Sequence, residues 1–470
     1  MVSFSSLDLI IIFSFFGILL LIGFLSGGKE SNTADGYLLS GRKVGLLLFI
    51  LTNVSTWYGG ILGVGEFTYR YGILSWVTQG LPYYFFAILF AFFFASKIRN
   101  SSLFTIPDKL DEIYGRKVGI LSAVIIFILV SPAPYLLMAG NLLSLIFEID
   151  IFWGLLAGIL LSASYLLVGG YRSDLLTDAF QFFVMFAGFI IIMIFSVSDF
   201  GGTEFLVNNL PETHLQFTGG ASVVYVTVWF LIALWTFTDP GFHQRCYAAK
   251  DGRTAKFGII ISVFLWLIFD FLTNVTGLFA KAVIPDLVNP VLAFPIYAEK
   301  ILGSGFKGVF YAALFATILS TLNSFLFLSA TTFGRDFVFK LKRETENTNL
   351  KKYVQSGIII SSAIAVILGL LFTSVIDIWY TIGSICIPGI ILLIIGAYFE
   401  KFRVSGKTAF YEIIVSVAAS LIWILIRPNF ESTNILSEIE PMIIGLAAAL
   451  ILHLKYLFRK NLIKSIITEK

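Results

Sequence analysis

Residues 46–67 read LLLFILTNVSTWYGGILGVGEF, an apolar segment that polar residues and then glycines interrupt halfway along. About 20 apolar residues span a bilayer as a helix. The hydroxyl and amide side chains from Thr52 to Thr56, followed by glycines between Gly59 and Gly65, predict that this helix is broken near its middle. An unwound helix at the bilayer midplane exposes backbone carbonyls, from which secondary transporters build ion and substrate sites.

A second segment of the same kind follows at 224–246, VYVTVWFLIALWTFTDPGFHQRC, where Thr238, Asp239, Pro240 and Gly241 interrupt the apolar run. Five membrane segments separate the starts of the two, so they face opposite ways across the membrane. This spacing predicts a five-plus-five inverted repeat. Each break alone also fits an ordinary membrane helix, because glycines allow close packing and hydroxyls bond to carbonyls of the preceding turn.

The composition identifies an integral membrane protein. Hydrophobic residues make up 58% of the chain and charged residues 13%, and the mean hydropathy is +0.91, whereas soluble domains carry about 25% charged residues. The net charge of +3 is too small to indicate nucleic acid as a partner. Cys246 and Cys386 lie in different segments, so we expect buried thiols and neither a disulfide nor a transition-metal site.

We expect an all-α membrane protein with one transporter domain over residues 1–470. The first apolar stretch, at 7–25, has no cleavage site behind it and is predicted to be a retained helix and not a signal peptide. The predicted organisation is an extra N-terminal helix at 5–26, a first repeat at 44–198, a second repeat at 221–399 and two C-terminal helices at 409–458. The thirteen predicted segments are 5–26, 44–69, 73–96, 118–147, 151–169, 174–198, 221–240, 256–280, 306–334, 354–374, 378–399, 409–426 and 440–458.

The distribution of basic residues predicts the orientation. With the N-terminus outside, the cytoplasmic loops hold all but five of the 32 Lys and Arg residues, among them Lys29, Arg172 and Arg245. This asymmetry follows the positive-inside rule and predicts an N-out, C-in topology. The compact length and the lack of sorting tails suit a multi-pass protein of a bacterial inner membrane.

Polar residues inside the apolar segments are the candidate site residues. Asp174 and Asp178 lie one turn apart in GGYRSDLLTDAFQ at 169–181. An ionisable group costs roughly 2.5 to 3.5 kcal/mol at the centre of a membrane helix, so its presence needs a reason. The segment at 306–334 places hydroxyls on one face, and hard oxygen ligands of this kind suit an alkali cation. These hydroxyls belong to Thr317, Ser320, Thr321 and Ser324.

Four stretches together resemble the sodium:solute symporter family, which includes sodium/glucose, proline and choline cotransporters, over nearly the whole chain. They are GGYRSDLLTDAFQ at 169–181, TDPGFHQRCYAAK at 238–250, FTIPDKLDEIYGRKVG at 104–119, and AALFATILSTL with ATTFGRD between 312 and 336. The resemblance implies a LeuT-type fold with one helix ahead of the two repeats, which agrees with the segment count.

The resemblance also implies a sodium site. Its ligands would be main-chain oxygens at Ile50 and Asn53, the carbonyl of Thr317 and the hydroxyls of Ser320 and Thr321. Asp178 matches an acidic residue beside that site and would help to hold or release the ion. In some members this carboxylate and hydroxyls of the segment at 306–334 form a second sodium site, for which Asn323 and Ser324 are the nearby residues. Asp174 has no counterpart, and we expect it at the cytoplasmic interface, solvated or paired with Arg172.

The resemblance bears on the substrate as well. Sugar-transporting members have a carboxylate and a lysine where this chain has Trp76 and Trp266, which disfavours a sugar, since hydroxyls buried against indole would lack partners. Trp57 and Tyr83 match two aromatics that surround the quaternary ammonium in choline cotransporters, a use of cation–π attraction. We add Gln79, near Trp76, to the candidate substrate site.

Asp239 and Asp270 favour an amino acid or an amine over an anion. Asp239 has two interpretations of equal weight, a substrate ligand or a cap on the backbone N–H groups freed beside Pro240. We expect His243 to be a solvated interfacial residue. No motif places a nucleophile and a base together, so no enzymatic activity is indicated.

The sequence therefore predicts a sodium-coupled symporter that imports a small organic solute by alternating access. The expected partners are the solute, sodium ions and lipid, with sodium as coupling ion, no other cofactor, and a monomer or weak homo-oligomer. A substrate-sensing receptor of the same fold, a proton-coupled carrier and a sodium or water leak pathway remain alternatives.

Overall fold

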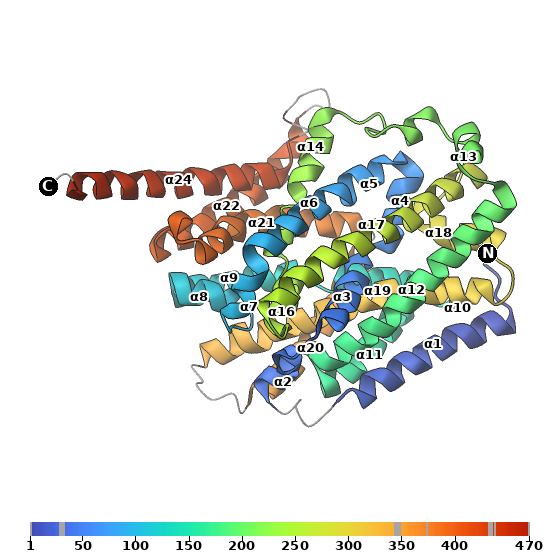
Figure 1. Cartoon of the computed structure of the whole chain (residues 1–470), viewed down its shortest axis with the longest axis horizontal. Helices are drawn as coiled ribbons and strands as arrows, with labels where there is room; N and C mark the ends of the chain where they lie inside the picture. Colours follow the sequence, from blue (N-terminus) through green and yellow to red (C-terminus); the bar gives the residue numbers. More distant parts are fainter. Residues whose placement is uncertain are drawn as a thin grey trace.

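The computed structural model describes residues 2–27, 33–342, 349–372, 375–430, 436 and 439–468. Lys29, counted among the cytoplasmic basic residues, lies outside these ranges, as does the end of the segment predicted at 354–374. Within them the chain is helical, and an isolated bridge joins Val44 to Ala249. Figure 1 shows the helices side by side along the long axis, with α1 (Ser6–Leu25) beginning at one end and α24 (Pro441–Thr468) reaching the other.

The first predicted break is confirmed. Helix α3 (Leu46–Ser55) and helix α4 (Ile61–Tyr71) are joined by the short 3-10 helix η3 (Thr56–Tyr58), and the two halves meet at an angle of 56°. Glycine is required at the bend, because a Cβ on Gly59 would overlap the side chain of Thr321. The break therefore lies directly against the segment that carries the predicted hydroxyl face.

The second predicted break is also present and divides the chain into α14 (Val223–Ile232), α15 (Trp235–Thr238) and α16 (Pro240–Ala248). Proline at the first position of α16 suits a helix start, where the missing N–H is not needed. Asp239 is the N-cap, and its Oδ1 accepts a hydrogen bond from the Phe242 N–H at 3.0 Å. The apolar span continues to Ala248, so the predicted end at residue 240 is wrong by two turns.

Helix α19 (Phe306–Thr331) is the centre of the bundle. Every residue in its 18-residue apolar stretch is buried, and it packs against α1, α10 (Ala133–Phe147), α12 (Tyr171–Phe200) and α20 (Leu350–Leu371). Its N-terminus is fixed by Asp8, whose Oδ1 accepts from the N–H groups of Gly305 and Gly308, both at 2.8 Å. Protein therefore surrounds the hydroxyl side chains of α19.

The other helices complete this scaffold. In the first half they are α2 (Ala34–Leu39), α5 (Leu74–Gln79), α6 (Leu81–Phe90), α7 (Ser96–Asn100), α8 (Ile106–Tyr114), α9 (Arg116–Leu129) and α11 (Ile151–Gly169). In the second half they are α13 (Thr203–Asn209), α17 (Gly252–Val283), α18 (Ala293–Ile301), α21 (Val375–Tyr398) and α22 (Gly406–Ile426). Two π-helical stretches, Ala91–Ala95 and Thr332–Phe339, extend α6 and α19.

Twelve helices of the described ranges are long and apolar enough to cross a membrane, and the bent pair α3–α4 makes up to thirteen. Length and composition alone decide this number, so the thirteen spans, the N-out orientation and the limits of the two repeats stay predictions.

Candidate functional site

A cluster of buried oxygen atoms joins the break of α3 to helix α19. The Thr321 hydroxyl donates to the carbonyl of Thr56 at 2.6 Å, and it also lies 3.4 Å from the carbonyl of Thr317. The Thr56 hydroxyl lies 3.5 Å from that of Ser320 and donates to Asp178 Oδ2 at 2.9 Å. We call Thr56, Asp178, Thr317, Ser320 and Thr321 the oxygen cluster. Four of its five members are residues predicted for the sodium site.

The remaining two predicted sodium ligands, Ile50 and Asn53, are buried on α3, before the break. Among the described hydrogen bonds, those from this region to α19 involve Thr56 and not these two residues. Asn53 instead lines the cavity described below, so the role of both main-chain oxygens stays a prediction.

Asp174 is fully buried, which corrects the expectation that it lies solvated at the interface. The backbone turns at Gly170, where φ is +59°, and α12 begins immediately, so its first turn already lies inside the protein. Ser324 donates to Asp174 Oδ2 at 2.7 Å, whereas Arg172 is exposed. Asp174 therefore faces α19 from the same side as Asp178, one turn away.

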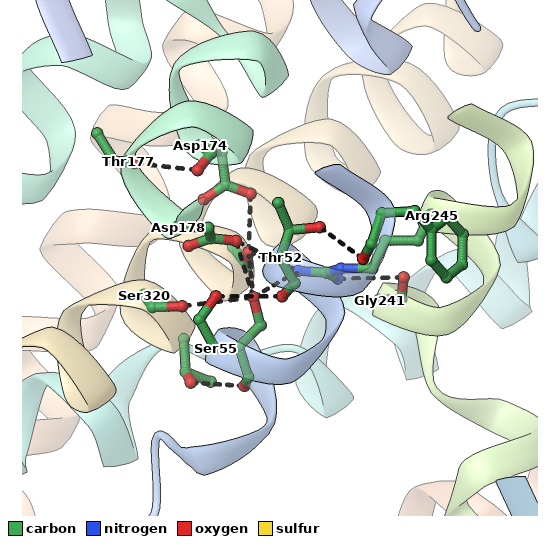
Figure 2. Close-up of polar contacts among 12 residues, drawn as sticks. Thr52, Ser55, Asp174, Thr177, Asp178, Gly241, Arg245 and Ser320 are labelled. Carbon is green, nitrogen blue, oxygen red and sulfur yellow. Dashed lines mark hydrogen bonds and ion pairs between the residues drawn. The ribbon is translucent and has the colours of Figure 1, made fainter. Parts of the chain in front are cut away.

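Arg245 is the residue that the sequence interpretation missed. Its side chain is 3% exposed and reaches from α16 toward the oxygen cluster, as Figure 2 shows. Its Nη2 donates to the Thr56 hydroxyl at 2.5 Å and lies 3.5 Å from Asp178 Oδ2. The prediction that the segment at 221–240 ends at residue 240 places Arg245 among the cytoplasmic charges. The signal available in the sequence was the Asp-Pro start of a new helical turn, which carries Arg245 back into the protein.

His243 is likewise buried and not solvated, for the same reason. One of its ring nitrogens, Nε2, lies 3.0 Å from the carbonyl of Phe237, a group freed at the break. It therefore contacts the break and not the solvent.

A cavity of about 250 Å³ adjoins the oxygen cluster. Of the predicted substrate residues, six contribute to its wall: Trp57, Trp76, Gln79, Tyr83, Asp239 and Asp270. The seventh, Trp266, is fully buried behind Trp57, against which it stacks at 4.8 Å between ring centroids. Trp266 is thus a support for Trp57 and not part of the wall. The wall also contains Tyr135, Trp229, Trp235 and Trp379, aromatics that the sequence did not single out.

Asp270 is held in the wall by neighbours of its own. The Tyr84 hydroxyl donates to Asp270 Oδ2, and the Trp76 indole N–H donates to that hydroxyl at 3.2 Å. The Asp270 carbonyl accepts from the amide of Asn274 at 2.8 Å, and Asn274 accepts from Thr68 at 3.1 Å. This network fixes the carboxylate at the cavity surface, and no basic side chain of the described residues forms an ion pair with it.

Asp239 serves as the helix cap in this structure, and it also borders the cavity. The capping interpretation is confirmed, while a role as substrate ligand stays a prediction.

An aromatic cavity with two carboxylates, beside two broken membrane helices and a buried oxygen cluster at one break, is the arrangement of a secondary transporter. The comparisons agree. A model of the sodium:solute symporter family matches residues 37–416, so this chain belongs to that family. It is a transporter and not an enzyme, and a multi-pass integral membrane protein of the plasma membrane.

Relatives cover nearly the full chain at low identity. The Haemophilus influenzae sodium/pantothenate symporter is 26% identical over 88% of this chain and 89% of its own length. The Bacillus subtilis osmoregulated proline transporter OpuE is 25% identical over 93% and 92%. Among solved structures, a Na+-coupled sialic acid symporter in a substrate-bound outward-open state has a TM-score of 0.81, at 18% identity and coverage of 96% and 97%. The LeuT-type fold is thereby confirmed.

Proposed function

We propose that this protein is a sodium-coupled symporter that imports a small organic solute bearing an ammonium group, an amino acid or an amine, by alternating access. The observation that carries the proposal is the pair of carboxylates, Asp239 and Asp270, in an aromatic cavity directly beside the oxygen cluster. Family membership and the names of the relatives support sodium as the coupling ion.

The oxygen cluster suits sodium because its groups are hard oxygen ligands. The Thr321 hydroxyl donates a hydrogen bond to the carbonyl of Thr56, so the lone pairs of the hydroxyl oxygen remain free to face a cation. The Asp178 carboxylate adds a negative charge at the same place, and a buried carboxylate gains from a cation that offsets its desolvation. Together these groups come from α12, α19 and the α3 break, so an ion there would join three separate elements of the bundle.

The cavity suits a compact cationic or zwitterionic group. Small-molecule sites for drug-sized ligands enclose roughly 300 to 1,000 Å³, so a volume of about 250 Å³ fits a smaller solute. The Asp270 carboxylate attracts an ammonium, and the indole of Trp57 adds cation–π attraction. A sugar would find few partners on this largely aromatic wall.

Coupling between the two sites follows from linkage. If sodium binds the substrate-competent conformation more tightly, substrate must raise the affinity for sodium by the same factor. Thr56 belongs to the oxygen cluster and also to the cavity wall, so each site touches the same short segment.

The test is the thermal stability of the purified protein against L-proline, choline, pantothenate and glucose, each in sodium and in potassium. We expect an ammonium-bearing compound to stabilise the protein in sodium only. Counterflow of that compound, labelled, into proteoliposomes then separates a carrier from a leak pathway. Equal stabilisation in potassium, or stabilisation by glucose or pantothenate alone, overturns the proposal.

A further inference from the structure

We propose that Arg245 is a tethered cation that holds the oxygen cluster until sodium displaces it, and that the displaced guanidinium then binds the carboxylate of the substrate in the cavity. The inference rests on the proposed function and sharpens it, because it selects an amino acid over an amine.

Arg245 makes the contacts that a bound cation would make. Besides Thr56 and Asp178, its Nη2 lies 3.4 Å from the carbonyl of Thr52 and 3.3 Å from the hydroxyl of Ser324. These are four oxygen atoms from α12, α19 and the α3 break, gathered around one positive nitrogen. Two of them, the Thr56 hydroxyl and Asp178 Oδ2, belong to the oxygen cluster. Sodium and the guanidinium therefore compete for the same charge and the same lone pairs.

Two buried carboxyl groups lie near the single guanidinium of Arg245. Asp174 and Asp178 are both fully buried, and the Oδ1 atom of each lacks a hydrogen-bond partner among the described residues. Carboxylates left in this state gain from an additional cation. Sodium bound to Thr56 and Asp178 would occupy the oxygen atoms that Arg245 Nη2 contacts, and the two positive charges would repel each other.

Arg245 lies at the edge of the cavity. Its Nη1 donates to the carbonyl of Gly241 at 3.3 Å. A Cβ at Gly241 would lie 2.9 Å from Asp239 Oδ1 and 3.2 Å from Arg245 Nη1. A side chain at residue 241 would therefore crowd both the guanidinium and the Asp239 carboxylate, and glycine keeps this edge of the cavity free of one.

A guanidinium that turns from the oxygen cluster into the cavity supplies a carboxylate-binding group where the wall otherwise has Asp239 and Asp270. Arginine binds carboxylates through two parallel hydrogen bonds. The ammonium of the same solute would be held by Asp270 with Trp57, so an α-amino acid meets both charges. Sodium binding would then raise amino acid affinity, which is the sign of coupling that symport requires.

The first test measures binding of ²²Na⁺ alone to purified wild type, Arg245→Gln and Gly241→Ala. Removing the competitor should lower the half-maximal sodium concentration about 5-fold or more. Alanine at position 241 would place a methyl group against the guanidinium and the Asp239 carboxylate. We expect it to hinder the movement of Arg245 toward the cavity and to raise the half-maximal sodium concentration by at least about 2-fold. Two variants with opposite shifts are not expected from loss of stability, which weakens binding in both.

The second test measures the binding affinity of two compounds, the α-amino acid that stabilises the wild type best and the carboxamide of that amino acid. Arg245→Gln should weaken binding of the amino acid about 10-fold or more and change binding of the carboxamide by no more than about 2-fold. It should also abolish the increase in sodium affinity that the amino acid causes. Preference of the wild type for the carboxamide, or for a simple amine, overturns the proposal.

Folding is controlled with two further variants. Arg245→Lys keeps the positive charge and should keep the sodium affinity near that of the wild type. If Arg245→Gln does not fold, the double variant Arg245→Gln/Asp174→Asn restores the net charge of the buried groups and serves in its place. Wild type that binds no sodium contradicts the proposed function itself. A different outcome contradicts only the role of Arg245. In it the wild type binds sodium, and Arg245→Gln and the charge-restored variant bind sodium with the same affinity as the wild type.

Discussion

Valine at position 321 nearly keeps the shape of threonine but lacks the hydroxyl that joins helix α19 to the α3 break. In the native chain this hydroxyl donates to the Thr56 carbonyl at 2.6 Å, and Thr321 is buried. Removing the donor leaves that carbonyl without this partner, which costs about 1 to 3 kcal/mol of unfolding free energy. If the hydroxyl oxygen of Thr321 also coordinates sodium, the variant loses this ligand, and the loss in sodium-binding free energy is of similar size.

A loss of about 1 to 3 kcal/mol in ion binding corresponds to a half-maximal sodium concentration raised about 5- to 150-fold. We would measure this concentration by ²²Na⁺ binding to purified Thr321→Val, and unfolding by thermal denaturation without sodium. Thr321→Ser is the matched control, because it keeps the hydroxyl and loses a methyl group. We expect it to bind sodium like the wild type within about 3-fold.

The two measurements separate a ligand from a purely structural hydroxyl. If Thr321→Val loses stability but binds sodium with unchanged affinity, the oxygen cluster is not the sodium site. If the serine control loses as much sodium affinity as the valine variant, the methyl contact and not the hydroxyl is responsible.

Three further predictions concern other parts of the molecule. Asp270→Asn should raise the substrate concentration for half-maximal uptake about 10-fold or more, since a hydrogen bond to a charged group is lost; an unchanged value would exclude it as a substrate ligand. Asp239→Asn should keep the unfolding free energy, because asparagine caps helices as well as aspartate, whereas Asp239→Ala should lose about 1 kcal/mol in denaturation; equal losses would contradict the capping role. Burial acts to raise the pKa of Glu299, but hydrogen bonds from Lys307 and the N-terminal segment lower it below its ordinary value of 4.5. This contribution to stability is present above pH 4.5 and is lost as pH falls below it, so Glu299→Gln should show a smaller loss of melting temperature on acidification, and an identical pH profile would refute the prediction.

The two breaks were predictable because their causes are local. Glycines around Gly59 and the Asp239–Pro240 pair change the backbone wherever they occur in a helix, and the structure bends at the first break and interrupts the helix at the second. The hydroxyl face of α19 was predictable from helical spacing for the same reason. These local features and the family resemblance together predicted the fold and four members of the oxygen cluster.

The positions of Arg245 and Asp174 could not be predicted from local pattern. Both lie at the ends of apolar segments, where charged residues usually meet water or lipid headgroups. Whether such a residue points inward depends on the helix that follows the break and on the turn at Gly170, which are set by tertiary packing. The same holds for Trp235 and Trp379, because a sequence rich in aromatics does not show which of them share a cavity.

Helix α19 has no lipid-facing side along its apolar stretch, since every residue there is buried. In α22 and in the final helix only 28% of the corresponding stretch is buried, so most positions there accept any apolar residue. When a library of random substitutions is selected for transport, we therefore expect substitutions to be lost on all faces of α19. In α22 we expect them to be lost only on one narrow face. Tolerance to mutation would then follow position in the bundle more closely than hydrophobicity.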